Sequence, residues 1–211
     1  MRVALLTSVS KNIAHLAALT VPNKLEYCLR HGYSLIVDNR PYEEVVKNLS
    51  DIILSALADH DMVWTLDCDA VITNMTVPIH TLECLGPAMT VCEEGIVEWN
   101  RINCGSVVWR RGCRTTYLLE RMREAEEEWT NLPCQQQSWL GERAESAGDL
   151  ITVAPLRTFN SCAWNMPGGG TGQPGTHWQP ADLVYHPCGI FPLSSNRVAA
   201  VTNALSRMVT R

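Results

Sequence analysis

The sequence has no long uncharged hydrophobic stretch and no concentration of basic residues. No window approaches the length of a membrane span, and the amino-terminal apolar run is short, broken by Lys11 and His15, and without a cleavage-site pattern. The 17 lysines and arginines are scattered along a chain of net charge −5, so there is no basic stripe to track a phosphate backbone. We therefore expect no membrane span and no nucleic-acid partner.

The cysteines also lack the spacing that would pair them. Nine cysteines is an odd number, and none of them forms a C-x-x-C motif or a tight cluster with histidine. Disulfide frameworks and structural zinc sites both depend on such patterns. Together with the absence of a secretion signal, this predicts free thiols and a cytoplasmic location.

An alternation of strand and helix patterns fills the first third of the chain. The predicted order is a strand at 2–7, a helix from about 11 that breaks at Pro22 and resumes over 24–31, a strand at 34–37, a helix at 43–58 and a strand at 62–66. Gly32 stands where a helix C-cap glycine is expected. Such alternation is typical of a mostly parallel sheet with helices on both sides. We expect residues 1–211 to form a single α/β domain.

The patterns in the rest of the chain are weaker. They predict strands at 88–91 and 105–109, helices at 115–129 and from 135 to 140, and a last helix capped by Ser194 or Ser195 and ending near Met208. The segment 166–175 is too rich in glycine and proline for regular structure. It is interpreted either as a lid or binding loop or as a surface insertion.

Two aspartates, Asp67 and Asp69, follow the predicted buried strand at 62–66. Ligands of open parallel sheets bind at the carboxyl ends of strands, and side chains two residues apart on a strand point the same way. Both carboxylates can therefore face one cation. Oxygen ligands suit Mg²⁺ or Mn²⁺, which bind through one or two carboxylates together with substrate phosphates. The pair predicts a divalent ion and a phosphorylated ligand, with a solvated turn as the alternative.

Two enzyme classes use aspartates in this way. In haloacid-dehalogenase-like phosphatases the first aspartate of D-x-D-x-[T/V] is a nucleophile, and DCDAV at 67–71 fits that pattern with Asp67 in the role. Those enzymes resemble one another in beginning with the motif and in carrying a later lysine and an acidic pair. Here a β-α-β unit precedes the motif and no lysine follows Lys47. The second class is the nucleotide-sugar-dependent glycosyltransferases.

Five segments, in order, resemble motifs of family 34 of the glycosyltransferases, the α-galactosyl- and α-xylosyltransferases, and of related viral enzymes. NKLEYCLRHGYSLIVDN (23–39) is similar to N-K-x-x-Y-[AC]-x-x-H-G-Y, and VWTLDCDAVITNM (63–75) to W-x-D-x-D-A-x-x-x-N-M. INCGSVVWRR (102–111), QQQSWL (135–140) and HWQPADLVYHPCG (177–189) resemble N-x-G-x-x-x-x-R, D-D-Q-S-x-L and W-x-x-x-D-x-x-x-H-x-x-G. The resemblance implies a GT-A fold and a nucleoside diphosphate sugar as donor.

The resemblance also implies a metal site. Asp69 would ligate Mn²⁺ or Mg²⁺ directly, Asp67 would bind the ion, the donor ribose or both, and His186 would be the third ligand. The ion would bridge the two phosphates and neutralise the leaving diphosphate. The family places a lysine near the diphosphate after its histidine, and here the nearest base is Arg197.

Substrate contacts follow from the same comparison. Candidates for the nucleoside are Thr7, Ser8, Asp38, Asn39 and Lys47, although the first four fit ordinary turns and Lys47 fits a solvated lysine. Candidates for the sugar and acceptor side are Asn103, Gly105, Gln136 and Gly189. Gln137 matches the family glutamine near the reacting carbon, but Gln135 and Gln136 replace the acidic residues that usually precede it. With Asp182 as the remaining candidate acid, we expect a retaining transfer assisted by Gln137.

Taken together, the sequence predicts a metal-dependent glycosyltransferase. We expect it to move a sugar from a nucleoside diphosphate sugar, a UDP-hexose or UDP-pentose, to a glycan or another hydroxyl acceptor. The expected origin is bacterial, phage or viral, or the chain is one domain of a larger polypeptide. Two alternatives stay open: the phosphatase with Asp67 as nucleophile, and a non-catalytic carbohydrate-binding domain.

Overall fold

The computed structural model describes residues 1–94, 101–162, 177–187 and 195–209. Its centre is a six-stranded sheet with the strand order β2-β1-β3-β6-β5-β7. A second sheet of three short strands has the order β4-β9-β8. The strands are β1 (Val3–Ser8), β2 (Ser34–Asp38), β3 (Met62–Leu66), β4 (Val71–Ile72), β5 (Met89–Glu93), β6 (Ile102–Arg110), β7 (Ile151–Ala154), β8 (Ser161–Cys162) and β9 (Val184–His186).

The central sheet is mostly parallel, as predicted. β1 pairs in parallel with both β2 and β3, and β5 pairs in parallel with β7. β6 lies between β3 and β5 and runs antiparallel to both. The carboxyl ends of β1, β2 and β3 therefore lie at one edge of the sheet, where the two aspartates follow β3.

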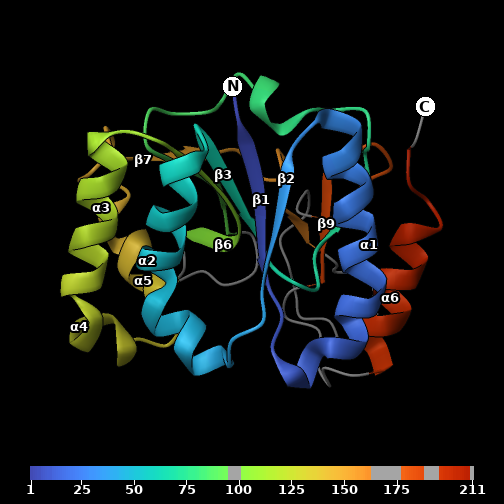
Figure 1. Cartoon of the computed structure of the whole chain (residues 1–211), viewed down its shortest axis with the longest axis horizontal. Helices are drawn as coiled ribbons and strands as arrows, with labels where there is room; N and C mark the ends of the chain where they lie inside the picture. Colours follow the sequence, from blue (N-terminus) through green and yellow to red (C-terminus); the bar gives the residue numbers. More distant parts are fainter. Residues whose placement is uncertain (95–100, 163–176, 188–194, 210–211) are drawn as a thin grey trace.

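Helices cover both faces of the central sheet (Figure 1). The helices are α1 (Ala14–His31), α2 (Tyr42–Asp59), α3 (Cys113–Glu124), α4 (Glu126–Thr130), α5 (Gln136–Arg143) and α6 (Ser195–Leu205), with short 3-10 turns at Lys11–Ile13 and Ile79–Thr81. α1 and α6 lie together on one side of the sheet, and α2, α3 and α5 lie on the other.

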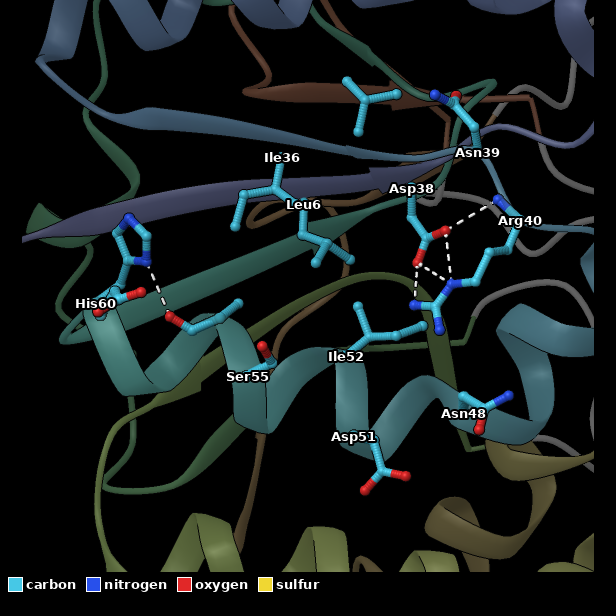
Figure 2. Close-up of a pocket in the computed structure, with 13 residues that line it drawn as sticks. Leu6, Ile36, Asp38, Asn39, Arg40, Asn48, Asp51, Ile52, Ser55 and His60 are labelled. Atoms are coloured by element: carbon cyan, nitrogen blue, oxygen red, sulfur yellow. Dashed lines mark hydrogen bonds and ion pairs between the residues drawn. The ribbon is translucent and has the colours of Figure 1, made fainter.

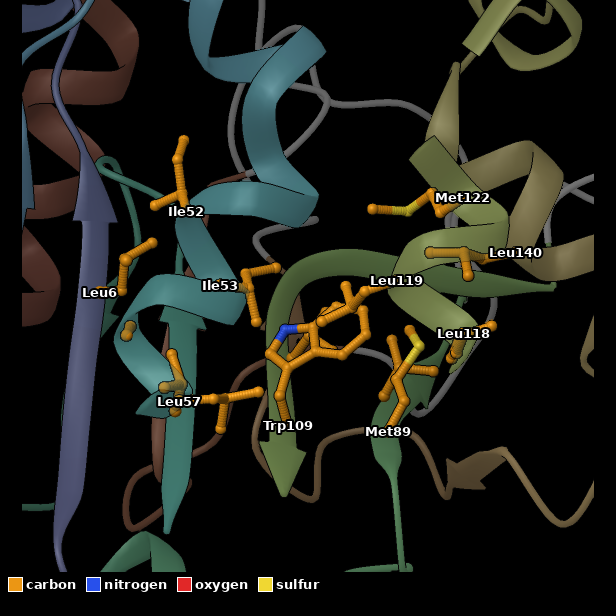
Figure 3. Packing of buried hydrophobic residues seen from close by; sticks show 14 of the residues in the cluster. Leu6, Ile52, Ile53, Leu57, Met89, Trp109, Leu118, Leu119, Met122 and Leu140 are labelled. Atoms are coloured by element: carbon orange, nitrogen blue, oxygen red, sulfur yellow. The ribbon is translucent and has the colours of Figure 1, made fainter. Parts of the chain in front are cut away.

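Strand alternation divides the buried side chains into two cores. On β1, Ala4 and Leu6 join the cluster that contains α2 and α3 residues, whereas Val3 and Leu5 join the cluster under α1. Figure 3 shows the first cluster, in which Trp109 of β6 lies among apolar side chains of α2 and α3. Because successive strand residues point to opposite faces, a single apolar strand can serve two cores.

Helix α1 does not break at Pro22, so that prediction is wrong. The helix runs without interruption from Ala14 to His31. A proline removes the hydrogen bond to the carbonyl four residues earlier, here that of Ala18. Both Pro22 and Ala18 are on the exposed side of the helix, where water can satisfy that carbonyl. The predicted C-cap holds, because Gly32 adopts φ 68° and ψ 35° and its N–H donates to the Cys28 carbonyl.

The predicted helix at 115–129 is two helices, α3 and α4, which meet at Ala125. The break lets the buried Trp129 turn back, so that its indole N–H donates to the Met122 carbonyl at 2.7 Å. The strand predicted at 105–109 extends over Ile102–Arg110, and the last helix ends at Leu205 rather than near Met208. The predicted loop at 166–175 and the cap Ser194 lie outside the described residues.

Within the described parts of the chain, no helix has the length and hydropathy needed to cross a bilayer. Seven of the cysteines in those parts, at positions 28, 68, 84, 92, 104, 113 and 134, are not in disulfide bonds.

Candidate active site

Asp67, Asp69 and His186 form one group at the carboxyl end of β3. One ligand atom from each residue lies within 4.8 Å of those of the other two. Nε2 of His186 is 3.5 Å from Oδ2 of Asp67 and 3.5 Å from Oδ1 of Asp69. The Asp67 side chain is 58% exposed and that of Asp69 is 9% exposed, so one carboxylate of the pair faces the solvent and the other is buried.

The small second sheet brings His186 to the aspartates. β4 begins two residues after Asp69 and pairs antiparallel with β9, with Val71 opposite Tyr185 and Ile72 opposite Val184. Continuing this register places His186 opposite Ala70, the residue that follows Asp69. A candidate ligand from near the end of the chain is thus set beside the aspartates by two short strands.

The missing side chain of Gly105 leaves room for His186. A Cβ atom at position 105 would lie 2.0 Å from Cε1 and 2.5 Å from Nδ1 of His186. The Gly105 carbonyl also accepts a hydrogen bond of 2.8 Å from the Asp67 N–H. Gly105 therefore packs directly under the ligand group.

Helix α1 holds the segment that carries the aspartates. The fully buried Lys24 donates from Nζ to the carbonyls of Cys68 at 3.1 Å and Ala70 at 2.7 Å. Thr20 Oγ1 also donates to the Cys68 carbonyl, at 2.5 Å. Asn23 makes two hydrogen bonds of 2.9 Å with the backbone of Ile72, one through Nδ2 and one through Oδ1.

The same helix face continues to bind the chain beyond β4. Tyr27 Oη donates to the Val77 carbonyl and accepts from the Ile79 N–H, each at 2.7 Å. His31 Nε2 lies 3.0 Å from the Met75 carbonyl. The N-K-x-x-Y-x-x-x-H segment is therefore a row of side chains that fixes the backbone after the aspartates.

The charges at the site are closely balanced. Burial alone would raise the pKa of Asp69, but the hydrogen bond and charge of His186, with the charges of Arg197 and Lys24, hold it below its usual value. Burial would lower the pKa of His186, but hydrogen bonds and attraction from Asp67 and Asp69 raise it to about 10. Burial lowers the pKa of Lys24 to about 8, against the attraction of its acidic neighbours. The positive charges of His186, Arg197 and Lys24 therefore compensate the aspartates.

Arg197 is one of those cations. It comes from the first turn of α6, its side chain is 14% exposed, and its guanidinium is paired with Oδ2 of Asp69. Oδ1 of the same carboxylate faces His186. Asp69 thus holds one cation with each oxygen.

A cavity of about 790 Å³ opens beside the ligand group. Six of the residues predicted to form the site line it, namely Ser8, Asp67, Asp69, Gly105, Gln136 and Gln137. Oε1 of Gln137 accepts the Cys104 N–H at 2.8 Å, and Nε2 of Gln136 donates to the Val46 carbonyl at 2.7 Å. α5 is therefore held against β6 and α2, with its first turn at the cavity.

Other predicted residues lie elsewhere. Thr7 is buried and faces away from the lining residue Ser8, because neighbours on a strand point to opposite faces. Asp38 and Asn39 line a separate groove of about 550 Å³ between β2 and α2, where Asp38 is paired with Arg40 (Figure 2). Lys47 is exposed on α2 and lines neither space.

The candidate acid Asp182 and the sugar-side candidate Asn103 are both engaged with the protein. Asp182 accepts two hydrogen bonds from Arg157, at 2.9 and 2.8 Å, and one each from Ser161 Oγ and the Gln179 N–H, both at 2.8 Å. It does not line the cavity. Asn103 is buried, and its amide bonds to neighbouring side chains and backbone. Gly189 lies outside the described residues.

Sequence reasoning missed five residues around the site. Lys24 lies under the aspartates, Asn160 contacts His186, Glu94 contacts Asn103, and Arg40 and Tyr42 line the cavity. A signal existed for Lys24, because positions 20, 23, 24, 27 and 31 form one polar stripe at helical spacing. No local pattern marks Asn160, whose role depends on a distant residue.

The ligand group fits a divalent ion. Two carboxylates and one imidazole are oxygen and nitrogen ligands that Mn²⁺ and Mg²⁺ accept, and they converge on one point at the cavity. Arg197 and His186 already supply positive charge beside the buried part of the group. A bound ion would therefore replace positive charge that is already there, and it would not add a charge that lacks a partner.

Replacing Gly105 with alanine is expected to weaken Mn²⁺ binding at least tenfold, because the new Cβ would push the His186 ring from its place. Overpacking at this buried position should also lower the free energy of unfolding by about 1–3 kcal/mol. Isothermal titration with Mn²⁺ and urea unfolding measure the two effects. Gly148→Ala is the matched control, because a Cβ there meets nothing within 4 Å. Wild-type affinity in a folded Gly105→Ala protein would remove His186 from the ligand set.

Comparison with known proteins finds similarity to glycosyltransferases. Residues 3–89 match the model of the galactosyl transferase GMA12/MNN10 family. No curated protein gives a significant sequence match. Among solved structures, a glycosyltransferase involved in the glycosylation of the major capsid of PBCV-1 is 17% identical, with a TM-score of 0.72 over 97% of this chain and 98% of that one.

Two further structures show how widely the fold is shared. The galactosyltransferase LgtC, in complex with donor and acceptor sugar analogs, is 13% identical, with a TM-score of 0.55 over 99% of this chain and 97% of that one. Mouse xyloside xylosyltransferase 1 is 10% identical, with a TM-score of 0.56 over 91% of this chain and 100% of that one. The chain has the GT-A fold of these glycosyltransferases, and its residues 3–89 resemble the galactosyl transferase GMA12/MNN10 family.

Proposed function

We propose that the protein transfers a hexose or pentose from a nucleoside diphosphate sugar to an acceptor hydroxyl, with Mn²⁺ or Mg²⁺ bound by Asp67, Asp69 and His186. The observation that carries this proposal is the convergence of these three ligands at a cavity beside the carboxyl end of β3. When bound, the ion would act as a Lewis acid on the diphosphate leaving group.

Arg197 supports a diphosphate at this position. Its guanidinium is anchored on Asp69 and lines the cavity, so a second cation is available beside the metal ligands. Guanidinium groups bind phosphate oxygens in a fork geometry. UDP-sugars are the donors that we propose first, because the family resemblance points to galactosyl and xylosyl transfer.

The acids of the cavity favour transfer with retention. Among the described lining residues, the only carboxylates are the metal ligands Asp67 and Asp69. Inversion at a sugar carbon usually employs a carboxylate base, and double displacement usually employs a carboxylate nucleophile. Asp182 is bound to Arg157 instead, and we propose that its role is structural. Gln137 would assist a front-face transfer through its amide.

The alternative hypotheses have less support. The family match and the structures described above are glycosyltransferases, and none of them supports the phosphatase hypothesis. The intact ligand group argues against a carbohydrate-binding domain that has lost catalysis. Hydrolysis of a generic phosphate ester at a rate that depends on Asp67 would restore the phosphatase hypothesis.

The proposal is tested by titrating UDP with and without Mn²⁺, followed by donor hydrolysis over a panel of UDP-hexoses and UDP-pentoses. We expect UDP to bind tightly only with the ion, and one or two donors to be hydrolysed. Proton NMR of the first product formed gives the anomeric configuration, which should match that of the donor. Absence of UDP binding under both conditions would overturn the UDP assignment, and an inverted product would overturn retention.

Binding of Mn²⁺ is expected to tighten about tenfold for each pH unit between pH 6.5 and 8.5, because Nε2 of His186 must lose a proton whose pKa is about 10. Titration calorimetry in buffers of different ionisation enthalpy should show about one proton released per ion. His186→Gln is the control, and should bind weakly with little dependence on pH.

Loss of the His186 proton should also lower the free energy of unfolding of the metal-free protein as the pH rises. A histidine with a raised pKa contributes stability that is fully present below pH 6.5 and is lost as the pH rises toward 10. Lys24, whose pKa is lowered to about 8, acts in the opposite direction above pH 8. Urea unfolding between pH 6.5 and 8 therefore isolates His186, and stability that rises across this window would contradict the assignment.

A further inference from the structure

His186 has two ring nitrogens with different neighbours. Nε2 faces Asp67 and Asp69, and Nδ1 lies 3.1 Å from Oδ1 of Asn160, which is also buried. A neutral imidazole carries its proton on one nitrogen only, and a metal binds the other. The group that faces Nδ1 therefore decides whether Nε2 can be a ligand.

The backbone of Gly105 fixes the orientation of the amides that lead to His186. Its N–H can only donate, and it lies 2.9 Å from Oδ1 of Asn103. The amide nitrogen of Asn103 is then on the other side, where it donates to Oε2 of Glu94 at 2.8 Å. A carboxylate accepts hydrogen bonds, so both ends of the Asn103 amide agree.

Asn103 in turn orients Asn160. Oδ1 of Asn103 already accepts from the backbone and accepts again from Nδ2 of Asn160 at 2.8 Å. The amide nitrogen of Asn160 is thus committed toward Asn103, and its oxygen is the atom that faces His186. An amide oxygen only accepts, so Nδ1 of His186 must carry a proton.

We propose that Asn160 is a positioning residue that holds His186 in the tautomer with a free Nε2, and that Glu94 and Asn103 hold Asn160. The inference rests on the metal site proposed above. The hydrogen-bonded chain runs from Glu94 through Asn103 and Asn160 to His186, and it ends at the nitrogen opposite the two aspartates. Partners of this kind fix the ring orientation and the tautomer of metal-binding histidines.

Three variants separate this role from simple packing. Asn160→Leu keeps the approximate size of the side chain but removes the acceptor. Asn160→Asp keeps an acceptor for Nδ1 but loses the donor toward Asn103. Asn74→Leu is the matched control, because Asn74 is a buried asparagine that donates to the Ala181 carbonyl at 3.0 Å. Titration with Mn²⁺ gives the dissociation constant, and thermal unfolding of the metal-free proteins reports stability.

All three variants are expected to unfold at a lower temperature than wild type. Mn²⁺ binding should weaken 10–100-fold in Asn160→Leu, the range found when such partners of metal ligands are removed. It should stay within about threefold of wild type in Asn160→Asp and Asn74→Leu, because their histidine acceptor is intact. With Mg²⁺ bound to wild type, long-range proton–nitrogen NMR should show the His186 proton on Nδ1, assigned by its loss in His186→Gln.

The outcomes distinguish the two proposals. Wild type that binds no Mn²⁺ overturns the metal site, and this inference with it. Wild type that binds Mn²⁺ together with an equally tight Asn160→Leu protein overturns the role of Asn160 and leaves the site standing. Equal weakening in Asn160→Leu and Asn160→Asp would also overturn it, because the acceptor would then be irrelevant. If Asn160→Leu does not fold, two other results still test the role of Asn160. They are the Mn²⁺ affinity of the Asn160→Asp protein and the position of the His186 proton in the spectrum of wild type.

Discussion

Replacing Asp69 with asparagine is expected to lower turnover about a thousandfold and to abolish Mn²⁺-dependent nucleotide binding. Asp69 is the buried member of the aspartate pair, and its two oxygens face His186 and Arg197. An amide presents one oxygen and no charge, so both cations would lose their partner. A metal ion contributes several kcal/mol to such a reaction, and each 1.36 kcal/mol corresponds to about tenfold in rate.

Initial rates of donor hydrolysis and titration of UDP with Mn²⁺ measure the two losses. Asp67→Asn should have a smaller effect, because Asp67 is 58% exposed and water can take its place as a ligand. Asp149→Asn, at an exposed aspartate outside the cavity, should behave as wild type. An Asp69→Asn protein with normal turnover and normal metal dependence would show that the aspartate pair is not the metal site.

Replacing Lys24 with methionine is expected to lower the free energy of unfolding by about 2–4 kcal/mol. The Ala70 carbonyl would lose its Nζ donor, and the Cys68 carbonyl would keep only Thr20. Each buried polar group left without a partner costs about 1–3 kcal/mol. The methionine recovers part of this loss, because a buried ammonium is itself costly. The loop that carries the aspartates should also loosen and bind Mn²⁺ more weakly.

Urea unfolding and Mn²⁺ titration test this expectation, and Lys47→Met is the matched control. Lys47 is exposed on α2, so its replacement should change the free energy of unfolding by no more than about 0.5 kcal/mol. If Lys24→Met is as stable as wild type and binds Mn²⁺ equally well, the row of side chains on α1 does not support the site.

The aspartate pair could be predicted from local sequence because its chemistry depends on local geometry. An apolar strand followed by two acids one residue apart gives both the buried strand Met62–Leu66 and two carboxylates at its carboxyl end. Ser8 and Thr7 show the limit of the same reasoning. Both follow the apolar part of β1, but the phase of the strand sends only Ser8 to the cavity.

Pro22 and Gly105 illustrate effects that sequence patterns cannot predict. A proline disturbs a helix according to where the freed carbonyl lies, and in α1 it lies on the exposed side. Gly105 was expected among the contacts to the sugar and the acceptor. In the folded protein the nearest group is the ring of His186, which reaches it from β9.

The sequence by itself determined the succession of strands and helices, the mostly parallel sheet and the two candidate aspartate ligands. Those features arise from side-chain periodicity and from residue types within short segments. The third candidate, His186, followed only from the resemblance to family 34 of the glycosyltransferases. Only the tertiary structure decided that Asp182 pairs with Arg157, that Lys24 lies under the aspartates and that Asn160 faces His186. These are contacts between residues far apart in the chain, and they depend on strand pairing and helix packing that no local pattern encodes.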